Sequence, residues 1–402
     1  MNDKTKRAYE ILETLQSAYY KNQSDFTDFM NDFYESSNEA LSDTLKNLGI
    51  SGWDSNGNIE SFSRPMIQPI SKYQNKWYYN LYFDMIQEID KAKHQIWNCP
   101  QQDIPIFGTL PDVKFTAHIT KQNESDSIIL ISEGLRNFAF CISKIVSLSF
   151  KILEFEYGMD VLSTRKYIKE NIKSRQLYGK YAKMHCEYYT RGGCEHLGTD
   201  FPSDCYARLS MSMSTAINYF ALSHEYAHYF LGHLEQHNTV QKDKWHNELQ
   251  ADYHAIFLTL EVLSKEFNTT YILWGIYLYL KSLETFEIYD LSINDKLRFD
   301  NHPPFFFRKK VFMRVLKEIG ISKKFIDIKC IDYIIEKLRF QFTSIIIDIE
   351  SAAKNGEKTP DYFTENLVPK EFQEKIRLNL FLKWWERNYK KIEKMLGAKI
   401  KE

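Results

Sequence analysis

The chain has 402 residues, with 52 Lys and Arg against 53 Asp and Glu, so its formal net charge is −1. Nucleic-acid-binding proteins usually carry a basic excess, so we expect no nucleic-acid partner. A hydrophobic content of 44% is typical of a globular protein, and only 15 Gly and 10 Pro favour a helix-rich chain. Six cysteines in so long a chain do not predict a disulfide scaffold.

The first hundred residues predict helices. Residues 1–48 are polar and lead to Gly49, a residue type common just beyond a helix end. A connection rich in Gly, Ser, Asn and Pro follows at 51–65, and 71–97 read as a long amphipathic helix. The charged N-terminus lacks the apolar core of a secretory signal, which favours a cytoplasmic location.

After Pro100 the pattern changes. Two short β-prone runs, 114–120 and 127–132, are separated by a polar turn and predict a hairpin. Residues 133–153 favour a helix, and 176–205 look irregular. Helices resume from about Arg208 and dominate to the end. The apolar run within them, 271–280, is too short to span a bilayer, so no membrane partner is expected.

These elements predict an α+β fold that is mostly α. We place an N-terminal helical region at 1–100, a central domain at 101–320 and a C-terminal helical region at 321–402. The central domain would contain the small β-sheet or hairpin, with the added helices at both ends.

The segment 223–233 reads SHEYAHYFLGH. Upstream large apolar residues recur at helical spacing, and His224 and His228 continue that stripe toward the core. Because they are four residues apart, they lie one above the other, with Glu225 beside them. A buried polar group without a partner costs about 1–3 kcal/mol, and a metal ion would satisfy both imidazoles. The stripe consists of Leu209, Met213, Ile217 and Phe220.

A second helix, predicted over 243–263, places Glu248 and Asp252 on its apolar stripe. Carboxylates there are costly unless they meet a cation or strong donors. We therefore predict His224, His228 and Glu248 as metal ligands, with Asp252 orienting a ligand histidine. The alternative is an ion-pair network of the same side chains without metal.

HEYAHYFLGH followed by NELQAD resembles the gluzincins, zinc metallopeptidases whose third ligand is a glutamate. HPPFFFR at 302–308 resembles the His-Pro-…-Arg segment of the prenyl-protease-like branch. ILISEGLRNFAF and FALSHEYAHYFLGH resemble the phage-exclusion peptidase Lit and its bacterial relatives. The resemblance covers about 104–315 and implies a zincin-like metallopeptidase core.

The resemblance implies one catalytic Zn²⁺ with a water in its open position. Glu225 would take the proton of this water and pass it to the leaving amine. His302 would stabilise the oxyanion, although it equally suits a helix start before two prolines. Arg308 would assist it or steady a carboxylate.

The expected function is a zinc-dependent endopeptidase acting on a protein or peptide substrate. The hairpin at 114–132 would bind an extended substrate at its edge, or it would only cover the core. The extra helices suggest restricted action. The resemblance to Lit implies an activating protein or peptide trigger and a role in anti-phage defence.

Two other functions remain open. One is a catalytically silent binding or sensor module that keeps the zinc fold, which an intact Glu225 disfavours. The other is a regulatory metallopeptidase that cleaves a repressor. Such chains usually accompany a DNA-binding segment, which the neutral charge and the lack of a helix-turn-helix pattern disfavour.

The stretch 185–205 also contains potential metal ligands. It lacks the paired Cys-x-x-Cys knuckles of structural zinc sites, so a reduced loop with incidental thiols is the default interpretation. A second, structural zinc is the alternative. The residues are His185, Cys186, Cys194, His196 and Cys205.

Overall fold

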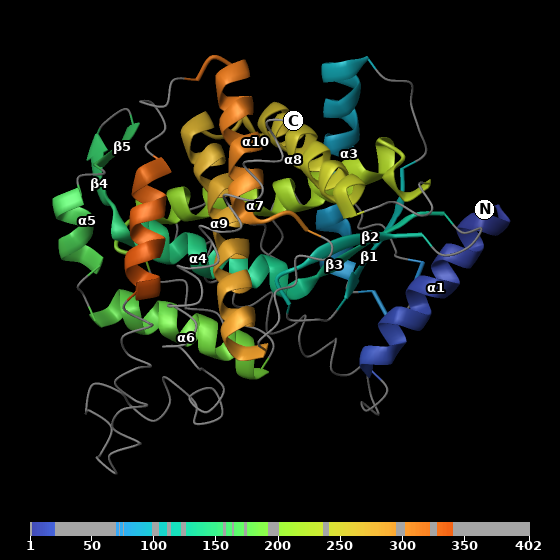
Figure 1. Ribbon diagram of the computed structural model, residues 1–402, viewed down its shortest axis with the longest axis horizontal. Coiled ribbons are helices and arrows are strands. Elements are labelled where there is room, and N and C mark those ends of the chain that lie inside the picture. The colour runs from blue at the N-terminus through green and yellow to red at the C-terminus, as the bar shows by residue number, and fades with distance from the viewer. Residues whose placement is uncertain are drawn as a thin grey trace, which may run out of the picture.

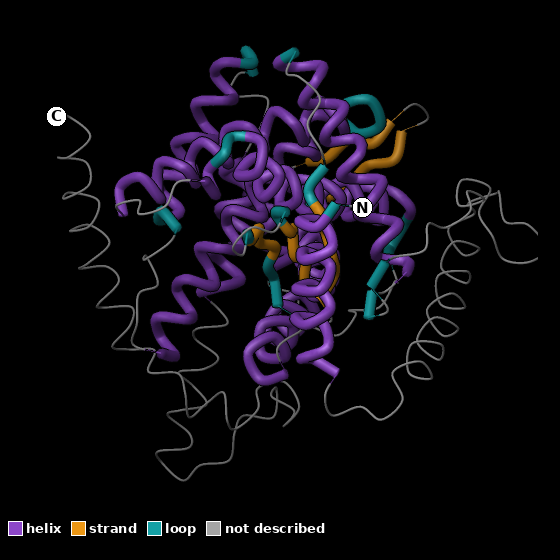
Figure 2. Tube along the Cα trace, turned by 90° about the vertical axis from the view of Figure 1, so that its right-hand side faces the viewer, coloured by secondary structure: helices purple, strands orange, loops and turns teal. Residues whose placement is uncertain are grey.

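Helices dominate the computed structural model, as Figures 1 and 2 show, and hold 76% of its described residues. A small sheet completes the fold, so the expected α+β, mostly α class is confirmed. The structure describes residues 2–20, 70–71, 73–74, 76–98, 104–110, 114–121, 126–155, 158–162, 165–172, 175–191, 201–235, 241–294, 302–321 and 328–340.

The main sheet has three strands in the order β1-β3-β2. Strands β2 (Ala117–Thr120) and β3 (Ile128–Ser132) pair antiparallel, which confirms the predicted hairpin. Strand β1 (Ile106–Leu110), which the sequence did not reveal, pairs parallel to β3. This order leaves β2 at an edge.

The register of β2 decides which backbone groups face outward. The backbone N–H of Ser132 donates to the carbonyl of Thr116, and Ala117 lies opposite Ile131. Because inward and outward groups alternate along an antiparallel strand, Ala117 and Ile119 direct their N–H and C=O groups away from β3.

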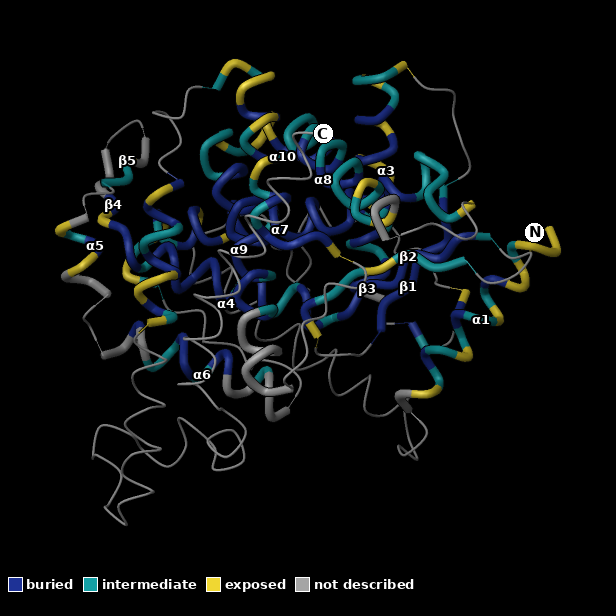
Figure 3. Tube along the Cα trace, in the orientation of Figure 1, coloured by how far each residue is buried: buried dark blue, intermediate teal, exposed yellow. Residues whose placement is uncertain are grey.

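Two long helices, both predicted, carry the histidines and carboxylates singled out above. Helix α7 (Asp204–Phe230) is buried over most of its length, as Figure 3 shows. A short 3₁₀ turn, η2 (His233–Glu235), follows it, and α8 (Gln241–Leu263) packs against α7. Since histidines four residues apart share a face of α7, their side chains meet those of α8.

Helices α4 (Glu133–Ser149) and α9 (Thr269–Asn294) also pack against α7. The approach of α9 is close: a Cβ added at Gly275 would lie 2.5 Å from the carbonyl oxygen of Met213. Any larger residue at this position would therefore separate α9 from α7. Helix α10 (Phe305–Glu318) packs on α8 and α9, and a further helix spans 328–340.

Helix α3 (Lys76–Trp97) is fixed to α7 by a buried polar cluster. The hydroxyl of Tyr226 donates to Asp90 Oδ1 at 2.5 Å. Lys93 Nζ lies 2.9 Å from the same carboxylate and donates to the Tyr226 hydroxyl at 3.2 Å. All three side chains are buried, so each satisfies the others in place of water.

The remaining described helix at the N-terminus, α1 (Asp3–Tyr20), covers the sheet. Its Ala8 and Leu12 form a small second core with side chains of β1 and β3. Leu12 packs over Gly108 so closely that any Cβ there would collide with its side chain. The strand residues in this core are Ile106, Leu110, Ile128 and Leu130.

Two local predictions were wrong. The helix expected over 133–153 ends at Ser149, and β4 (Lys151–Phe155) follows, paired antiparallel with β5 (Gly158–Leu162). The buried Phe150, between α4 and β4, has an extended backbone, φ −89° and ψ 161°, which directs the chain into β4.

The segment expected to be irregular, 176–205, contains most of helix α6 (Arg175–Arg191) and the start of α7. Leu177, Tyr181 and Met184 recur at helical spacing and are buried, and α6 packs against α4. The tertiary contact thus outweighs a weak local signal. A short helix, α5 (Arg165–Ile172), precedes α6.

The domain boundaries near 100 and 320 stay predictions. Side chains of α3, including Tyr82, Ile86 and Ile89, belong to the same hydrophobic core as those of α7. Parts of both terminal regions, 21–69 and 341–402, lie outside the described residues. No helix in the described part of the chain is long and apolar enough to cross a membrane.

Candidate metal centre

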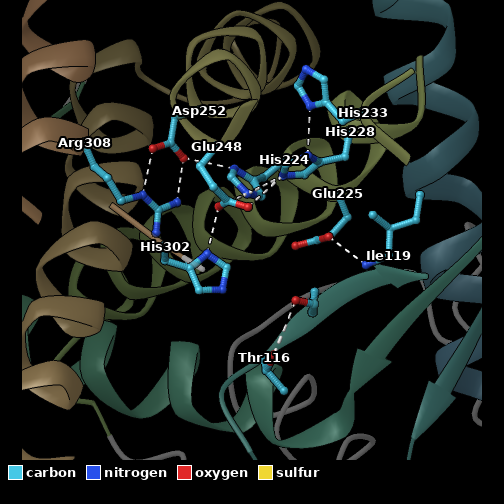
Figure 4. A network of polar contacts seen from close by, with 11 residues as sticks. Thr116, Ile119, His224, Glu225, His228, His233, Glu248, Asp252, His302 and Arg308 are labelled. Atoms are coloured by element: carbon cyan, nitrogen blue, oxygen red, sulfur yellow. Dashed lines mark hydrogen bonds and ion pairs between the residues drawn. The ribbon is translucent and has the colours of Figure 1, made fainter. Parts of the chain in front are cut away.

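Three side chains converge between α7 and α8, as Figure 4 shows. The Nε2 atoms of His224 and His228 lie 3.2 Å apart. Glu248 Oε2 lies 3.3 Å from the first of them, and Glu248 Oε1 lies 3.3 Å from the second. Among the described residues, these three side chains lie close enough to one another to hold a metal ion.

The separations fit a tetrahedral metal ion. Bonds of about 2.0–2.1 Å to zinc place two ligand atoms about 3.3 Å apart. The 3.2 Å between the two Nε2 atoms matches this value, and Glu248 presents one oxygen to each histidine at 3.3 Å. The histidines are buried and the Glu248 side chain is 12% exposed, so water is largely excluded from the donors.

Asp252 lies behind His224. Its Oδ1 is 3.0 Å from His224 Nδ1, which favours a proton on Nδ1 and a lone pair on the Nε2 that faces the centre. Arg308 binds both oxygens of Asp252, with Nε at 2.7 Å and Nη2 at 2.6 Å. Burial alone would raise the pKa of Asp252, but Arg308 and His224 lower it and keep the carboxylate charged.

His228 has a different outer partner. Its Nδ1 lies 2.9 Å from Nδ1 of His233, whose Nε2 lies 3.2 Å from Gln250 Oε1. Burial and the nearby His228 lower the pKa of His233 to about 4, so its ring is neutral near pH 7.

The charges also explain how the cluster holds together without a cation. Burial lowers the pKa of His224, but Asp252 and Glu248 together raise it to about 10. Burial raises the pKa of Glu248, and the three neighbouring imidazoles lower it strongly. A proton on His224 therefore bridges the metal-free site, and a bound cation would replace it. The geometry accommodates both the metal site and the ion-pair network.

Glu225 points from α7 toward the sheet. Its Oε2 accepts a hydrogen bond from the backbone N–H of Ile119 in β2 at 2.8 Å, as Figure 4 shows. The carboxylate is partly buried and lies on the side of the centre that faces the edge strand. The structure thus brings the predicted base and the predicted substrate edge together.

His302 lies beside Glu248, the predicted third ligand. Its Nδ1 is 2.8 Å from Glu248 Oε2, and its side chain is 61% exposed. The prolines that follow are buried, and α10 begins directly after them. Of the two roles expected for Arg308, the structure places it against a carboxylate, because Asp252 occupies its guanidinium.

Sequence reasoning missed Ile119, Gln250 and Tyr279. The first acts through its backbone, and Gln250 is one of several polar residues of α8, so neither had a signal. Tyr279 lies in an apolar run that reads as core, and its ring is 5.3 Å from that of Phe220. Burial raises the pKa of its phenol well above the usual range, and the charges of Arg308 and Glu225 also act on it.

The stretch 185–205 does not assemble a second metal group among the described residues. His185 is buried between aromatic rings, including those of Tyr181 and Phe138, and this burial lowers its pKa to about 3. Cys205 is buried at the start of α7, where its Sγ accepts a hydrogen bond from Arg208 at 3.2 Å. Cys194 and His196, and the side chain of Cys186, lie outside what the structure describes.

We found no match between this chain and any protein-family model, curated protein or solved structure. The functional argument therefore depends on the geometry of the site.

Proposed function

We propose that the protein is a zinc-dependent endopeptidase. The observation that carries the proposal is the convergence of His224, His228 and Glu248, whose two Nε2 atoms lie 3.2 Å apart and each have one Glu248 oxygen at 3.3 Å. The partners of the outer nitrogens and the distances between the inner donors both suit a tetrahedral zinc ion. Three protein ligands leave one position open, as in catalytic zinc sites.

The residues around the centre suit hydrolysis. Bound zinc would supply a water of lowered pKa and would polarise the scissile carbonyl. Glu225 would accept a proton from the attacking water and deliver it to the leaving amine. His302, which lies near the centre on the side of Glu248, would donate a hydrogen bond to the oxyanion. Its Nδ1 contacts Glu248, so Nε2 is the nitrogen that would serve this role.

A peptide is the substrate that the neighbouring edge favours. Ala117 and Ile119 direct backbone donors and acceptors outward from β2, and the second of them reaches Glu225. An extended chain added to this edge would therefore pass the proposed base. Hydrogen bonds to the main chain would give affinity with little sequence selectivity.

We further propose that cleavage is restricted to a protein target in the cytoplasm and is switched on by a protein or peptide trigger. The resemblance to Lit supports this reading and extends it to anti-phage defence. Digestion of unrelated unfolded proteins without any trigger would argue against it.

Two alternatives make different predictions. A silent zinc-fold sensor would bind metal but cleave nothing under any condition. A repressor-cleaving peptidase would act on a DNA-binding protein encoded nearby. Glu225 beside the donor set favours an enzyme, because a binding module has no use for a proton acceptor there.

The deciding experiment measures bound zinc per chain in the purified protein and in Glu248→Ala. Our proposal expects about one zinc ion in the wild type and a large loss in the variant. Zinc that survives the substitution would redirect attention to the stretch 185–205. No zinc in either protein after zinc is supplied would leave the ion-pair network and sink the proposal.

A further inference from the structure

His233 occupies an unusual position beside His228. It lies in η2, directly after the helix that carries both histidine ligands, and its ring is 5.0 Å from that of His228 at an interplanar angle of 70°. The Nδ1 atoms of the two rings approach to 2.9 Å. A ring that only filled space would not need to align two nitrogens at hydrogen-bond distance.

The orientation of the Gln250 amide decides the direction of this hydrogen bond. His233 Nε2 lies 3.2 Å from Gln250 Oε1, and a carbonyl oxygen only accepts. His233 must therefore carry its proton on Nε2. Because a neutral imidazole has one N–H, its Nδ1 is left as an acceptor, and the proton between the two rings belongs to His228 Nδ1.

The consequence reaches the centre. With its proton on Nδ1, His228 presents a bare Nε2 lone pair to the position shared with His224 and Glu248. If the amide of Gln250 were reversed, its NH₂ group would donate to His233 Nε2. His233 would then carry its proton on Nδ1 and donate it to His228 Nδ1, which would leave the proton of His228 on Nε2. His228 would then point an N–H at Glu248, which suits a hydrogen bond to the carboxylate and excludes a metal ligand.

We propose that His233 and Gln250 are positioning residues that set the tautomer of His228 for metal binding. This inference rests on the proposed zinc site and goes beyond it, because it assigns the control of the second ligand to residues outside the ligand set. Partners behind a metal ligand typically contribute about 10–100-fold to metal affinity.

The test compares zinc affinity by competition with a fluorescent chelator in the full chain. His233→Leu removes the acceptor, and we expect affinity to fall about 10–100-fold. His233→Asn places an amide oxygen near the former Nδ1 and should recover most of the loss. At the outer end of this row of hydrogen bonds, Gln250→Glu keeps the acceptor and should retain zinc affinity, whereas Gln250→Leu should lower it. His246→Leu, an exposed histidine of α8, is the matched control.

A second readout separates positioning from general damage to the fold. In the Co²⁺-loaded proteins, the visible absorption bands report the ligand field. They should change in His233→Leu even at saturating metal, and should match the wild type in His233→Asn and His246→Leu. Thermal unfolding of the metal-free proteins identifies any variant that fails to fold, and in that case the two Gln250 variants decide.

The outcomes are separable. If the wild type binds zinc and His233→Leu and Gln250→Leu bind it equally well with unchanged Co²⁺ spectra, the inference is overturned while the zinc site stands. If the wild type binds neither ion, both are overturned. Loss in the two Leu variants together with recovery in His233→Asn and Gln250→Glu would support the assigned proton directions.

Discussion

Glu225 accepts a hydrogen bond from the backbone N–H of Ile119 at 2.8 Å. The two residues are 106 positions apart, and the contact joins α7 to an edge strand. The same N–H is one that a peptide strand would use to pair with β2. Substrate binding at this point and release of the Glu225 carboxylate are therefore coupled in the proposed enzyme.

Replacing Ile119 by proline removes this N–H. Because it faces away from β3, no hydrogen bond of the sheet is lost, and edge strands tolerate proline there. We expect zinc content to be unchanged and peptide cleavage to fall about 10-fold, the value of one hydrogen bond. Cleavage of a mixed peptide library measures this, with Ile119→Val as control. Equal cleavage by both variants would contradict the edge as a substrate site.

Glu225→Gln tests the proposed base while keeping the size of the side chain. Its amide cannot accept the proton of the water, so turnover should drop about 10²–10⁴-fold at unchanged zinc content. Mass spectrometry of the peptide library after long incubation detects the residual activity. A variant as active as the wild type would remove Glu225 from the mechanism, whichever metal is bound.

Arg308→Met tests the carboxylate behind His224. Asp252 and Arg308 are both buried, and removing one partner of a buried ion pair costs about 3–5 kcal/mol. Only His224, 3.0 Å from Asp252 Oδ1, would then offset the charge of the carboxylate. Urea unfolding in the presence of a chelator should show this loss of stability. Arg308→Lys keeps the charge but donates from a single nitrogen, so we expect a smaller loss of stability. An unchanged unfolding midpoint in Arg308→Met would contradict the structure here.

His185 predicts a pH dependence of stability that is independent of the metal centre. Its folded-state pKa is lowered to about 3, so the unfolded chain takes up its proton first as the pH falls. This contribution is complete above about pH 6.5 and is lost as the pH falls toward 3, at about 1.4 kcal/mol per unit. Between pH 6 and 4, the free energy of unfolding measured with urea should therefore fall more steeply with decreasing pH in the wild type than in His185→Gln. The same pH dependence in both proteins would contradict this prediction. His246→Gln is the control for loss of an exposed histidine.

Helical periodicity was enough to predict the centre, because it needs only two helices and the faces that they bury. His224, His228, Glu248 and Asp252 are all brought together as expected. The hairpin was also predictable, since its strands are adjacent in the sequence. Whether an ion occupies the centre stays a prediction.

What could not be predicted depends on longer or less regular contacts. The pairing of β1 with β3 is parallel and joins strands that are not neighbours in the chain. The outer partner of His228 depends on the geometry of a single 3₁₀ turn. The contact to Ile119 is made by backbone, which no side-chain pattern can reveal. Such features arise only when separate elements have packed.

Tyr226 lies between His224 and His228 in the sequence but faces the opposite side of α7, where Asp90 and Lys93 of α3 hold its hydroxyl. A functional constellation needs its members within about 0.5 Å and 10–20° of their working positions. The buried hydroxyl contact on the reverse side limits rotation of α7 about its own axis. The angular precision of the centre is thus set partly by a helix that contributes no ligand to it.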